Sequence, residues 1–342
     1  MADSDLQINF RITLEESGGR LDEFLASRIG SLSRMRIAVL LEQGACLVNQ
    51  SAAPAGYHIA PGDSIEIVFD QDTPTAMSPE AIPLEILHED DHLLVVVKPA
   101  GMLVHPTRGV KNGTLLNALA YHLNRSRVDE ATEPGDEISN HGPLTSSSQS
   151  IIRPGLVHRL DRATSGLMVI AKTQRALGIL SRHFHRRLVE KSYLAIVQGN
   201  VAEDMLEIVA PIGRDPDRRP RWAVMESGRH AHTRMKVRHR TGEVTLIQLE
   251  PVTGRTNQLR IHCASIGHPV VGDDLYGDSG MNGLLSAPAP DSSFLRLCLH
   301  ASRLAFHHPV GGTWMEFTSA VPGDWPKITG LSWVEFQNSH VT

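Results

Sequence analysis

The sequence predicts a mixed α+β protein with two domains. The chain has 342 residues, more than one typical domain. Apolar runs of strand length alternate with helical patterns, and no repeat of fixed period is present. A stretch with three prolines at 73–83 has the composition of a linker between a small N-terminal part and the rest.

Residues 1–72 are expected to form a small α/β module. An amphipathic helix begins near Gly19 and a second near Ser33, which is a suitable N-cap. Short apolar segments at 46–49 and 64–68 are typical of strands, and the second follows a Pro-Gly-Asp turn.

Residues 84–330 are expected to form the larger domain. Its first strands are the segments LEILH and HLLVVVK, which an acidic turn at 89–91 separates. The stretch 123–150 is polar, acidic and poor in large apolar residues, so it predicts a mobile loop. A strand at 167–172 and a helix at 174–187 follow.

Charge is distributed unevenly along the chain. The formal net charge is -5, but residues 151–262 carry 20 Lys and Arg against 10 Asp and Glu. A basic region of this kind is either a solvated surface or the binding face for a polyanion. Charge alone leaves both interpretations open.

The three cysteines, Cys46, Cys263 and Cys298, have no paired spacing, which argues against a disulfide framework or a thiolate zinc site. The amino terminus has no apolar segment of the signal-peptide type, and no apolar run is long enough to span a bilayer. We therefore expect a cytoplasmic protein without membrane partners.

The densest chemical signal lies at 155–172. Asp161 stands between two arginines and is followed by hydroxyl residues, a glycine and an apolar strand-like run. Such a carboxylate is suited to be a reactive group on a loop above a rigid scaffold. The same residue types also fit a structural ion pair at a surface.

The spelling H-R-L-D-x-x-T-S-G-L at 158–167 resembles the signature of RluA-type, in particular RluC- and RluD-like, pseudouridine synthases, which modify ribosomal and transfer RNA. Segments at 90–106, 191–199, 251–262, 267–273 and 299–309 resemble further motifs of the family. The resemblance implies a mainly antiparallel catalytic domain with flanking helices, a central RNA-binding cleft and no cofactor.

The resemblance also assigns roles to individual residues. Asp161 aligns with the catalytic aspartate, Tyr193 with the active-site tyrosine, and Arg260 becomes the expected partner of Asp161. Asn257 departs from the pattern, because the family usually has histidine there. An amide can still donate and accept hydrogen bonds, but a contact that needs a charged imidazole is in doubt.

The first 72 residues resemble the alpha-L RNA-binding module of a small-subunit ribosomal protein and several RNA-modifying enzymes. This resemblance predicts phosphate contacts from Arg20, Arg34 and Arg36. In the catalytic domain the predicted RNA-binding residues are Arg159, Lys98, Arg255 and Gln258. Lys98 is also a candidate for structural support, and the basic clusters at 182–187 and 214–221 are either phosphate-binding or merely solvated.

We therefore predict a monomeric pseudouridine synthase that acts on large-subunit ribosomal RNA or ribosomal assembly intermediates. The alternatives are a tRNA-directed synthase and a non-catalytic RNA-binding or assembly factor. The histidine pairs lack metal-ligand spacing, so no metal is expected. The tetrapeptide Gly-Asp-Ser-Gly at 277–280 also occurs around the nucleophile of trypsin-like proteases, but the residues after it depart from that pattern.

Overall fold

The computed structural model describes residues 5–326, apart from Gly30, Ser31, Ser33, 71–77, Arg108, 131–151, 219–220 and 278–295. The chain forms two compact units. The first consists of Met1–Pro83 and His105–Pro154, and the second of Leu84–Val104 and Gly155–Thr342. Among the described helices, none is both long and apolar enough to cross a membrane.

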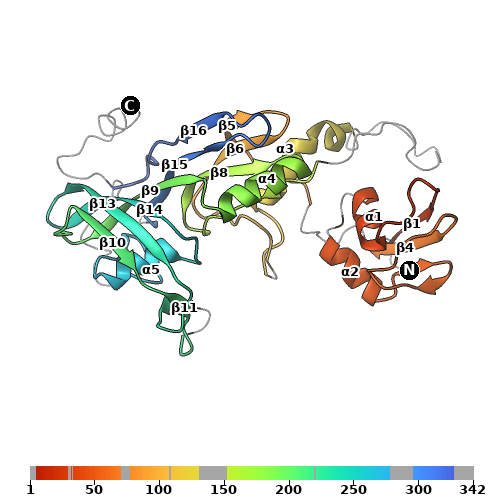
Figure 1. The fold of residues 1–342 in the computed structure, drawn as a ribbon, viewed down its shortest axis with the longest axis horizontal. Coiled ribbons are helices and arrows are strands. Elements are labelled where there is room, and N and C mark those ends of the chain that lie inside the picture. Colours follow the sequence, from red (N-terminus) through yellow and green to blue (C-terminus); the bar gives the residue numbers. More distant parts are fainter. Residues whose placement is uncertain are drawn as a thin grey trace. The chain divides into compact units, whose positions relative to one another are not determined.

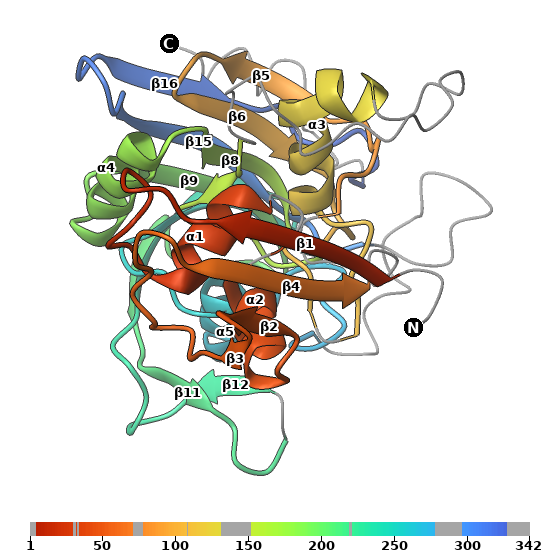
Figure 2. The ribbon, with the colours of Figure 1, turned by 90° about the vertical axis from the view of Figure 1, so that its right-hand side faces the viewer.

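The first unit contains a four-stranded antiparallel sheet in the order β1-β4-β2-β3. Figure 2 shows β1 and β4 running side by side, with α1 and α2 behind them. Leu21, Leu25, Ile37 and Ile65 are fully buried in the core between helices and sheet. The elements are β1 (Asp5–Arg11), α1 (Leu21–Arg28), α2 (Arg34–Glu42), β2 (Cys46–Val48), β3 (Ser51–Ala52), β4 (Ser64–Asp70) and α3 (Leu115–Glu130).

Two features of this unit differ from the sequence-based expectations. Strand β1 was not predicted, although it pairs along its whole length with β4. The segment 123–130 was predicted to be part of a mobile loop, but it is the second half of helix α3. The apolar residues Leu115, Ala118 and Leu119 are buried, so packing supports the start of this helix and the polar residues continue it. The rest of the predicted loop, 131–150, lies outside the described residues.

The second unit is built on a ten-stranded sheet (Figure 1), whose main order is β10-β13-β14-β9-β15-β8-β6-β5. Strand β16 pairs with β15, and β7 pairs with β8. The strands are β5 (Glu85–Glu89), β6 (Leu93–Lys98), β7 (Gly155–Leu156), β8 (Ser165–Ala171), β9 (Glu190–Gln198), β10 (Met205–Val209), β13 (His232–Arg240), β14 (Val244–Pro251), β15 (Leu299–His307) and β16 (Trp314–Thr318).

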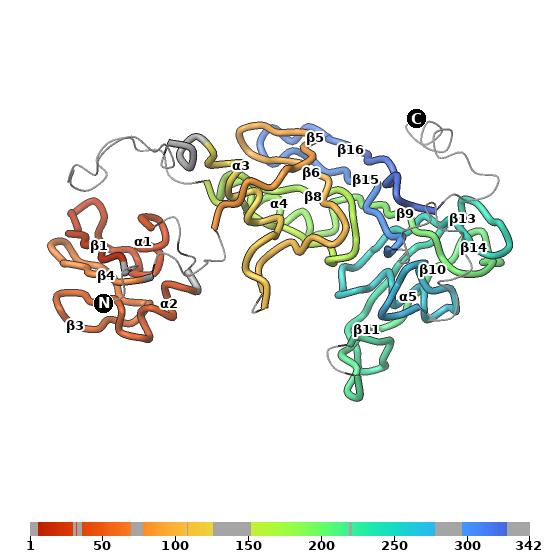
Figure 3. The backbone as a smooth tube through the Cα atoms, turned by 180° about the vertical axis from the view of Figure 1, so that it is seen from behind, coloured from red at the N-terminus to blue at the C-terminus, as the bar shows by residue number. Residues whose placement is uncertain are grey.

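Two helices and a hairpin accompany this sheet. Helix α4 (Gln174–His185) packs against β8, with the side chain of Thr173 accepting a hydrogen bond from the backbone of Ala176 at its start. Helix α5 (Gln258–Ser265) packs near β14. Figure 3 traces the hairpin of β11 (Ile212–Arg214) and β12 (Trp222–Val224), which extends beyond β10 and β13. The predicted mixed, mainly antiparallel α+β class is confirmed.

The second unit begins at Leu84, where the catalytic domain was predicted to begin, but 105–154 is grouped with the first unit. Residues 71–77 at the predicted linker lie outside the described residues. The division into a module at 1–72, a linker at 73–83 and a catalytic domain at 84–330 stays a prediction.

One junction in the large sheet is unusual. Among the strand pairs that the described residues form, only β8 and β15 run parallel, with Gly166 opposite Ala301. Gly166 has φ +118°, and a Cβ atom added to it would lie 2.3 Å from the carbonyl oxygen of Ala301. Only glycine allows this approach of the two backbones. Ala301 in turn pairs with Tyr193 on β9, so one row of residues crosses three strands.

We predict that Gly166→Ala destabilises the protein by about 3 kcal/mol, because the new methyl group forces β8 and β15 apart and strains the backbone. Urea unfolding followed by circular dichroism measures this change. Gly323→Ala is the matched control, since a Cβ atom there meets nothing within 4 Å. Equal stability of the two variants would contradict the close approach.

Candidate active site

Asp161 lies on a short loop between β7 and β8. The backbone N–H of Thr164 donates to the Asp161 carbonyl at 3.1 Å, which closes a turn just before β8 begins. Arg162 holds this loop to Gly101 through two hydrogen bonds. The backbone N–H of Gly101 donates to the carbonyl oxygen of Arg162 at 2.8 Å, and Nε of Arg162 donates to the carbonyl oxygen of Gly101 at 2.9 Å. The loop is therefore tied to the chain that follows β6.

Lys98, at the end of β6, supports the same loop from inside. Its side chain is fully buried, and Nζ donates to the carbonyl oxygens of Pro99, Met102 and Arg162 at 2.7, 2.9 and 3.2 Å. Burial lowers the pKa of Lys98 to about 7, although the charge of Asp161 opposes this shift. A buried ammonium with three carbonyl acceptors anchors the loop.

A cleft of about 990 Å³ opens above this loop. Asp161, Tyr193 and Arg260 all line it, so the three residues predicted to be catalytic are brought together. They come from the β7–β8 loop, from β9 and from α5. Six further cations line the cleft: Arg159, Arg187, Lys191, Arg234, Arg255 and Arg303.

Tyr193 reaches the cleft because of its register on β9. It is paired with Ala301, which pairs with Gly166 near the end of the Asp161 loop. Within the described chain, no hydrogen-bond partner is found for the Tyr193 hydroxyl. Burial raises the pKa of Tyr193 well above its ordinary value, and the negative charge of Asp161 adds to the effect. The hydroxyl therefore stays protonated at neutral pH.

Arg260 forms its ion pair with Asp273. Its Nε and Nη2 donate to the two carboxylate oxygens of Asp273 at 2.7 and 2.6 Å, a bidentate arrangement between two buried side chains. The prediction that Asp161 is the direct partner of Arg260 is therefore wrong for this structure. Arg260 acts on Asp161 through its positive charge, without an ion pair within 4.0 Å.

Asp273 is a residue of the site that the sequence analysis missed. Besides Arg260, its carboxylate accepts hydrogen bonds from the backbone N–H groups of Leu275 and Tyr276 at 3.0 and 2.9 Å. Burial alone would lower the pKa of Arg260, but its bonds to Asp273 raise it. The aspartate in the Gly-His-Pro-Val-Val-Gly-Asp motif was visible, but nothing in its spacing indicated a partner.

Asn257 provides a second contact to Arg260. It precedes α5 in the left-handed region at φ +53°, where asparagine is more common than most residues. Its Oδ1 accepts from Nη1 of Arg260 at 3.4 Å, and its Nδ2 donates to the hydroxyl of Tyr276 at 3.2 Å. The Tyr276 ring lies 5.2 Å from the Arg260 guanidinium. An uncharged amide thus suffices for these contacts.

Asp161 itself is partly buried, and its carboxylate has no direct partner among the described residues. Within the part of the chain that the structure describes, its carboxylate accepts no hydrogen bond and joins no ion pair. Burial raises the pKa of Asp161 above its ordinary value, while the charges of Arg260, Arg159 and Lys98 oppose the rise. Nearby charge thus favours the ionised form, and the oxygen lone pairs remain available for a substrate.

The chain is similar to known proteins in both sequence and structure. A sequence model of the family described as RNA pseudouridylate synthase matches residues 92–265. The chain belongs to the RNA pseudouridine synthase family. It is accordingly an isomerase that acts on RNA.

Relatives resemble this synthase over nearly the whole chain. An uncharacterised RNA pseudouridine synthase of Aquifex aeolicus is 37% identical over 96% of this chain and 97% of its own. Ribosomal large subunit pseudouridine synthase D of Nitrosomonas europaea is 38% identical over 90% of this chain and 83% of its own. The solved structure of human RNA pseudouridylate synthase domain containing 1 is 25% identical and has a TM-score of 0.54, covering 76% of this chain and 95% of that one.

Two predicted RNA-binding residues of the synthase have structural positions instead. Gln258 is buried, and its oxygen accepts from Thr253 and the Arg255 backbone while its nitrogen donates to His232 O and Thr233. All four of its hydrogen-bonding positions are therefore filled by protein. Lys98 is likewise buried and saturated, so it supports the loop, as its alternative role predicted, and does not face the cleft.

Two other predicted residues remain suited to RNA. Arg159 is exposed at the cleft, and the described residues offer it no ion pair. Arg255 is partly buried, and its Nε donates to His230 O at 3.0 Å, which leaves its terminal nitrogens on the cleft side free of any described partner. Their RNA contacts stay predictions.

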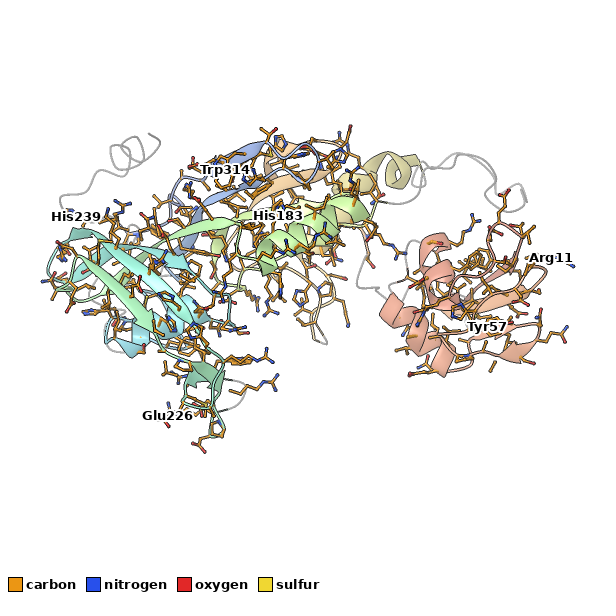
Figure 4. The ribbon with its side chains drawn as sticks, in the orientation of Figure 1. Arg11, Tyr57, His183, Glu226, His239 and Trp314 are labelled. Atoms are coloured by element: carbon orange, nitrogen blue, oxygen red, sulfur yellow. The ribbon has the colours of Figure 1, made fainter. Side chains whose placement is uncertain are left out.

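The arginines predicted to bind RNA in the first unit differ from one another. Arg20 forms a two-point ion pair with Asp22 at 2.9 and 3.2 Å, and 45% of its side chain stays exposed. Arg34 begins α2, but its side chain lies outside the described residues. Arg36 is partly buried on the same helix. Figure 4 shows the side chains of the N-terminal part of this unit, where Arg11 and Tyr57 are labelled.

Three other features considered in the sequence are the histidines and acids, the tetrapeptide at 277–280 and the cysteines. Among residues 5–326 outside the gaps, no group of three or more His, Cys, Asp or Glu side chains has the geometry of a metal site. Of the protease-like tetrapeptide at 277–280, only Gly277 is described. Burial raises the pKa of the thiols of Cys46, Cys263 and Cys298 to about 11, 12 and 12.

We predict that Asp273→Asn destabilises the folded protein by about 3–5 kcal/mol, because it leaves the buried Arg260 guanidinium without a countercharge. Denaturant unfolding measures the loss. Asp274→Asn is the neighbouring control: Asp274 lies 3.6 Å from Arg260, but 95% of its side chain is exposed, so little change is expected. Similar losses in both variants would contradict the assignment of the buried pair.

We also predict the direction of the pH dependence. With Asp161 as the predicted catalytic carboxylate, we expect activity to be lost as the pH falls through the pKa of Asp161, which burial raises above the ordinary carboxyl value. Arg159→Gln removes one of the charges that lower this pKa, so the acidic limb of kcat should move to higher pH. Single-turnover rates at saturating RNA measure the limb; a shift to lower pH would refute the electrostatic assignment.

Proposed function

We propose that this synthase isomerises selected uridines of large-subunit ribosomal RNA and that Asp161 is its essential carboxylate. One observation supports the proposal most directly. The Asp161 carboxylate has no partner among the described residues, although seven cations line its cleft. A carboxylate that only stabilised the fold would be expected to pair with one of them, as Asp273 pairs with Arg260. Asp161 keeps its oxygens free for a substrate.

The reaction rearranges bonds within one nucleotide. The N1–C1′ bond of uridine breaks, the uracil rotates and a C5–C1′ bond forms. The hydrogen on C5 leaves as a proton and N1 takes up a proton, so the product is an isomer of uridine. Asp161 can act at C1′ as a nucleophile, assist loss of uracil as a base, or add to C6 of the base. Each route requires it to be ionised and in contact with the nucleotide.

Arg260 and Tyr193 have supporting roles in this proposal. The guanidinium favours ionised Asp161 by its charge, while Asp273 and Asn257 hold its orientation. Tyr193 offers an aromatic face to the uracil. Because its pKa is raised, the tyrosine acts as a neutral phenol, which argues against the phenolate as the base that removes the C5 proton.

The target base has to leave its stack to reach this cleft, at a cost of about a few kcal/mol. Phosphate contacts offset that cost, and Arg159 and Arg255 are the proposed suppliers in the catalytic domain. We propose that residues 1–72 supply further contacts as a separate RNA-binding module, joined through 73–83 to a catalytic domain at 84–330.

Support for ribosomal RNA comes from two sources. The N-terminal module resembles that of enzymes that act on large-subunit RNA, and several relatives carry the name ribosomal large subunit pseudouridine synthase D. A tRNA-directed synthase is the alternative substrate class. A cytoplasmic location and a monomeric state stay predictions.

We predict that the wild-type protein releases tritium from C5-labelled, unmodified large-subunit ribosomal RNA, and that Asp161→Asn lowers the rate by about a thousandfold or more. Asp91→Asn, an exposed aspartate away from the cleft, is the matched control and should retain the rate. Because burial of the ionised carboxylate opposes folding at neutral pH, Asp161→Asn should not lower thermal stability.

The outcomes separate the candidates. Release from labelled tRNA but not from ribosomal RNA would favour the tRNA-directed enzyme. Tight RNA binding without release from either RNA, by a folded wild-type protein, would favour the binding or assembly factor. Undiminished release by Asp161→Asn would remove Asp161 from the mechanism.

A further inference from the structure

The turn that ends helix α4 places a non-glycine residue in an unfavourable backbone conformation. The N–H of Leu188 donates to His183 O at 2.9 Å, and the N–H of Arg187 donates to Phe184 O at 3.2 Å. This is the Schellman pattern, in which the residue at the Arg187 position is usually glycine because it is left-handed. Arg187 has φ +59°. His183, labelled in Figure 4, marks this last turn of α4.

The side chain of Arg187 gains no compensating contact within the described chain. It is exposed, it lines the cleft, and it joins neither an ion pair nor a side-chain hydrogen bond with a described residue. The adjacent acid, Glu190, is already bound to Arg303 at 2.9 Å. Backbone strain that the surrounding protein does not repay is characteristic of functional positions.

A second cation faces the same part of the cleft. Lys191 lies over the Phe184 ring, with Nζ 5.9 Å from its centre, and it also lacks a carboxylate partner in the described residues. Burial lowers the pKa of Lys191, and the like charge of Arg187 lowers it further. Neither cation is paired with a carboxylate of the described residues, so the two repel each other, and an anion between them would relieve the repulsion.

Packed aromatic rings connect Lys191 to the loop that carries Asp161. Phe184 stacks on His158 with ring centres 4.6 Å apart, and His158 accepts a hydrogen bond from the Val169 N–H at 3.0 Å. Burial lowers the pKa of His158 to about 3, and the charge of Lys191 contributes. The imidazole is therefore neutral and adds no third positive charge. His158 precedes Asp161 by three residues in the same loop. An anion bound by Arg187 and Lys191 would therefore lie next to residues that pack against the loop of the proposed catalytic carboxylate.

We propose that Arg187 and Lys191 form a phosphate subsite that binds one backbone phosphate of the RNA at the edge of the active-site cleft. The inference rests on the proposed function, because it takes RNA as the ligand of the cleft. The chemistry requires only a phosphodiester, so the subsite contributes affinity and position without reading the base sequence. It accounts for an arginine where the backbone favours glycine.

Arg187→Gly tests the subsite, because it should move stability and affinity in opposite directions. Relief of the left-handed strain should raise the thermal midpoint by about 2 °C. Loss of the charge should weaken binding of an unmodified large-subunit ribosomal RNA transcript about fivefold and make the slope of log Kd against log salt shallower by about one. A residue with a purely structural role would lose stability and leave the salt slope unchanged.

Two variants complete the experiment. Arg187→Lys keeps the charge and should retain most of the wild-type salt slope. Arg175→Ala removes an exposed charge from the first turn of the same helix, away from the cleft, and should leave slope and affinity unchanged. An unchanged slope in Arg187→Gly, or an equal change in Arg175→Ala, would overturn the subsite. Binding that depends on Arg187 without tritium release would instead contradict the proposed function alone.

Discussion

The close approach of β8 to β15 at Gly166 and Ala301 is the constraint on which the site depends. It allows one parallel strand pair inside an otherwise antiparallel sheet, and it leaves only β15 between β8 and β9, so the loop before β8 and Tyr193 of β9 line the same cleft. Asp161 and Tyr193 are 32 positions apart in the chain, yet this row of three strands directs both into one cleft. A rigid sheet below the loop keeps the geometry independent of the connections around it.

The charges around the cleft fall into two groups. Some are neutralised within the protein, as in the pairs of Arg260 with Asp273 and of Arg303 with Glu190 and Glu316. Others, including Asp161 and Arg159, have no described partner. Paired charges hold elements in place. An unpaired cation such as Arg159 can attract a polyanion, and the unpaired Asp161 carboxylate keeps its oxygens available to a substrate.

Much of this arrangement could be predicted from the sequence because it is local. The Asp161 loop, the strand that follows it and helix α4 lie within two residues of their expected positions, since apolar periodicity and glycine placement determine them. The three predicted catalytic residues share one cleft. Strand β1 was missed although its pattern alternates. The helical residues 123–130 were missed because polar composition does not show how far a helix extends beyond its packed start.

The errors at the site concern which partner a side chain takes. Sequence spacing could not distinguish Asp161 from Asp273 as the partner of Arg260, because both are carboxylates brought close only by folding. Burial explains the other two differences. Glutamine and lysine usually lie at protein surfaces, but Gln258 and Lys98 are buried and form their hydrogen bonds with the protein itself.

The anchor of the Asp161 loop depends on the protonation of Lys98. Lys98 satisfies three carbonyl oxygens, and an ammonium group has one hydrogen for each. A neutral amine has only two, so deprotonation leaves one carbonyl of the loop or its support without a donor. Because the pKa of Lys98 is about 7, the number of hydrogens on Nζ changes near neutral pH. All three hydrogen bonds that hold the Asp161 loop are therefore present only below that pH.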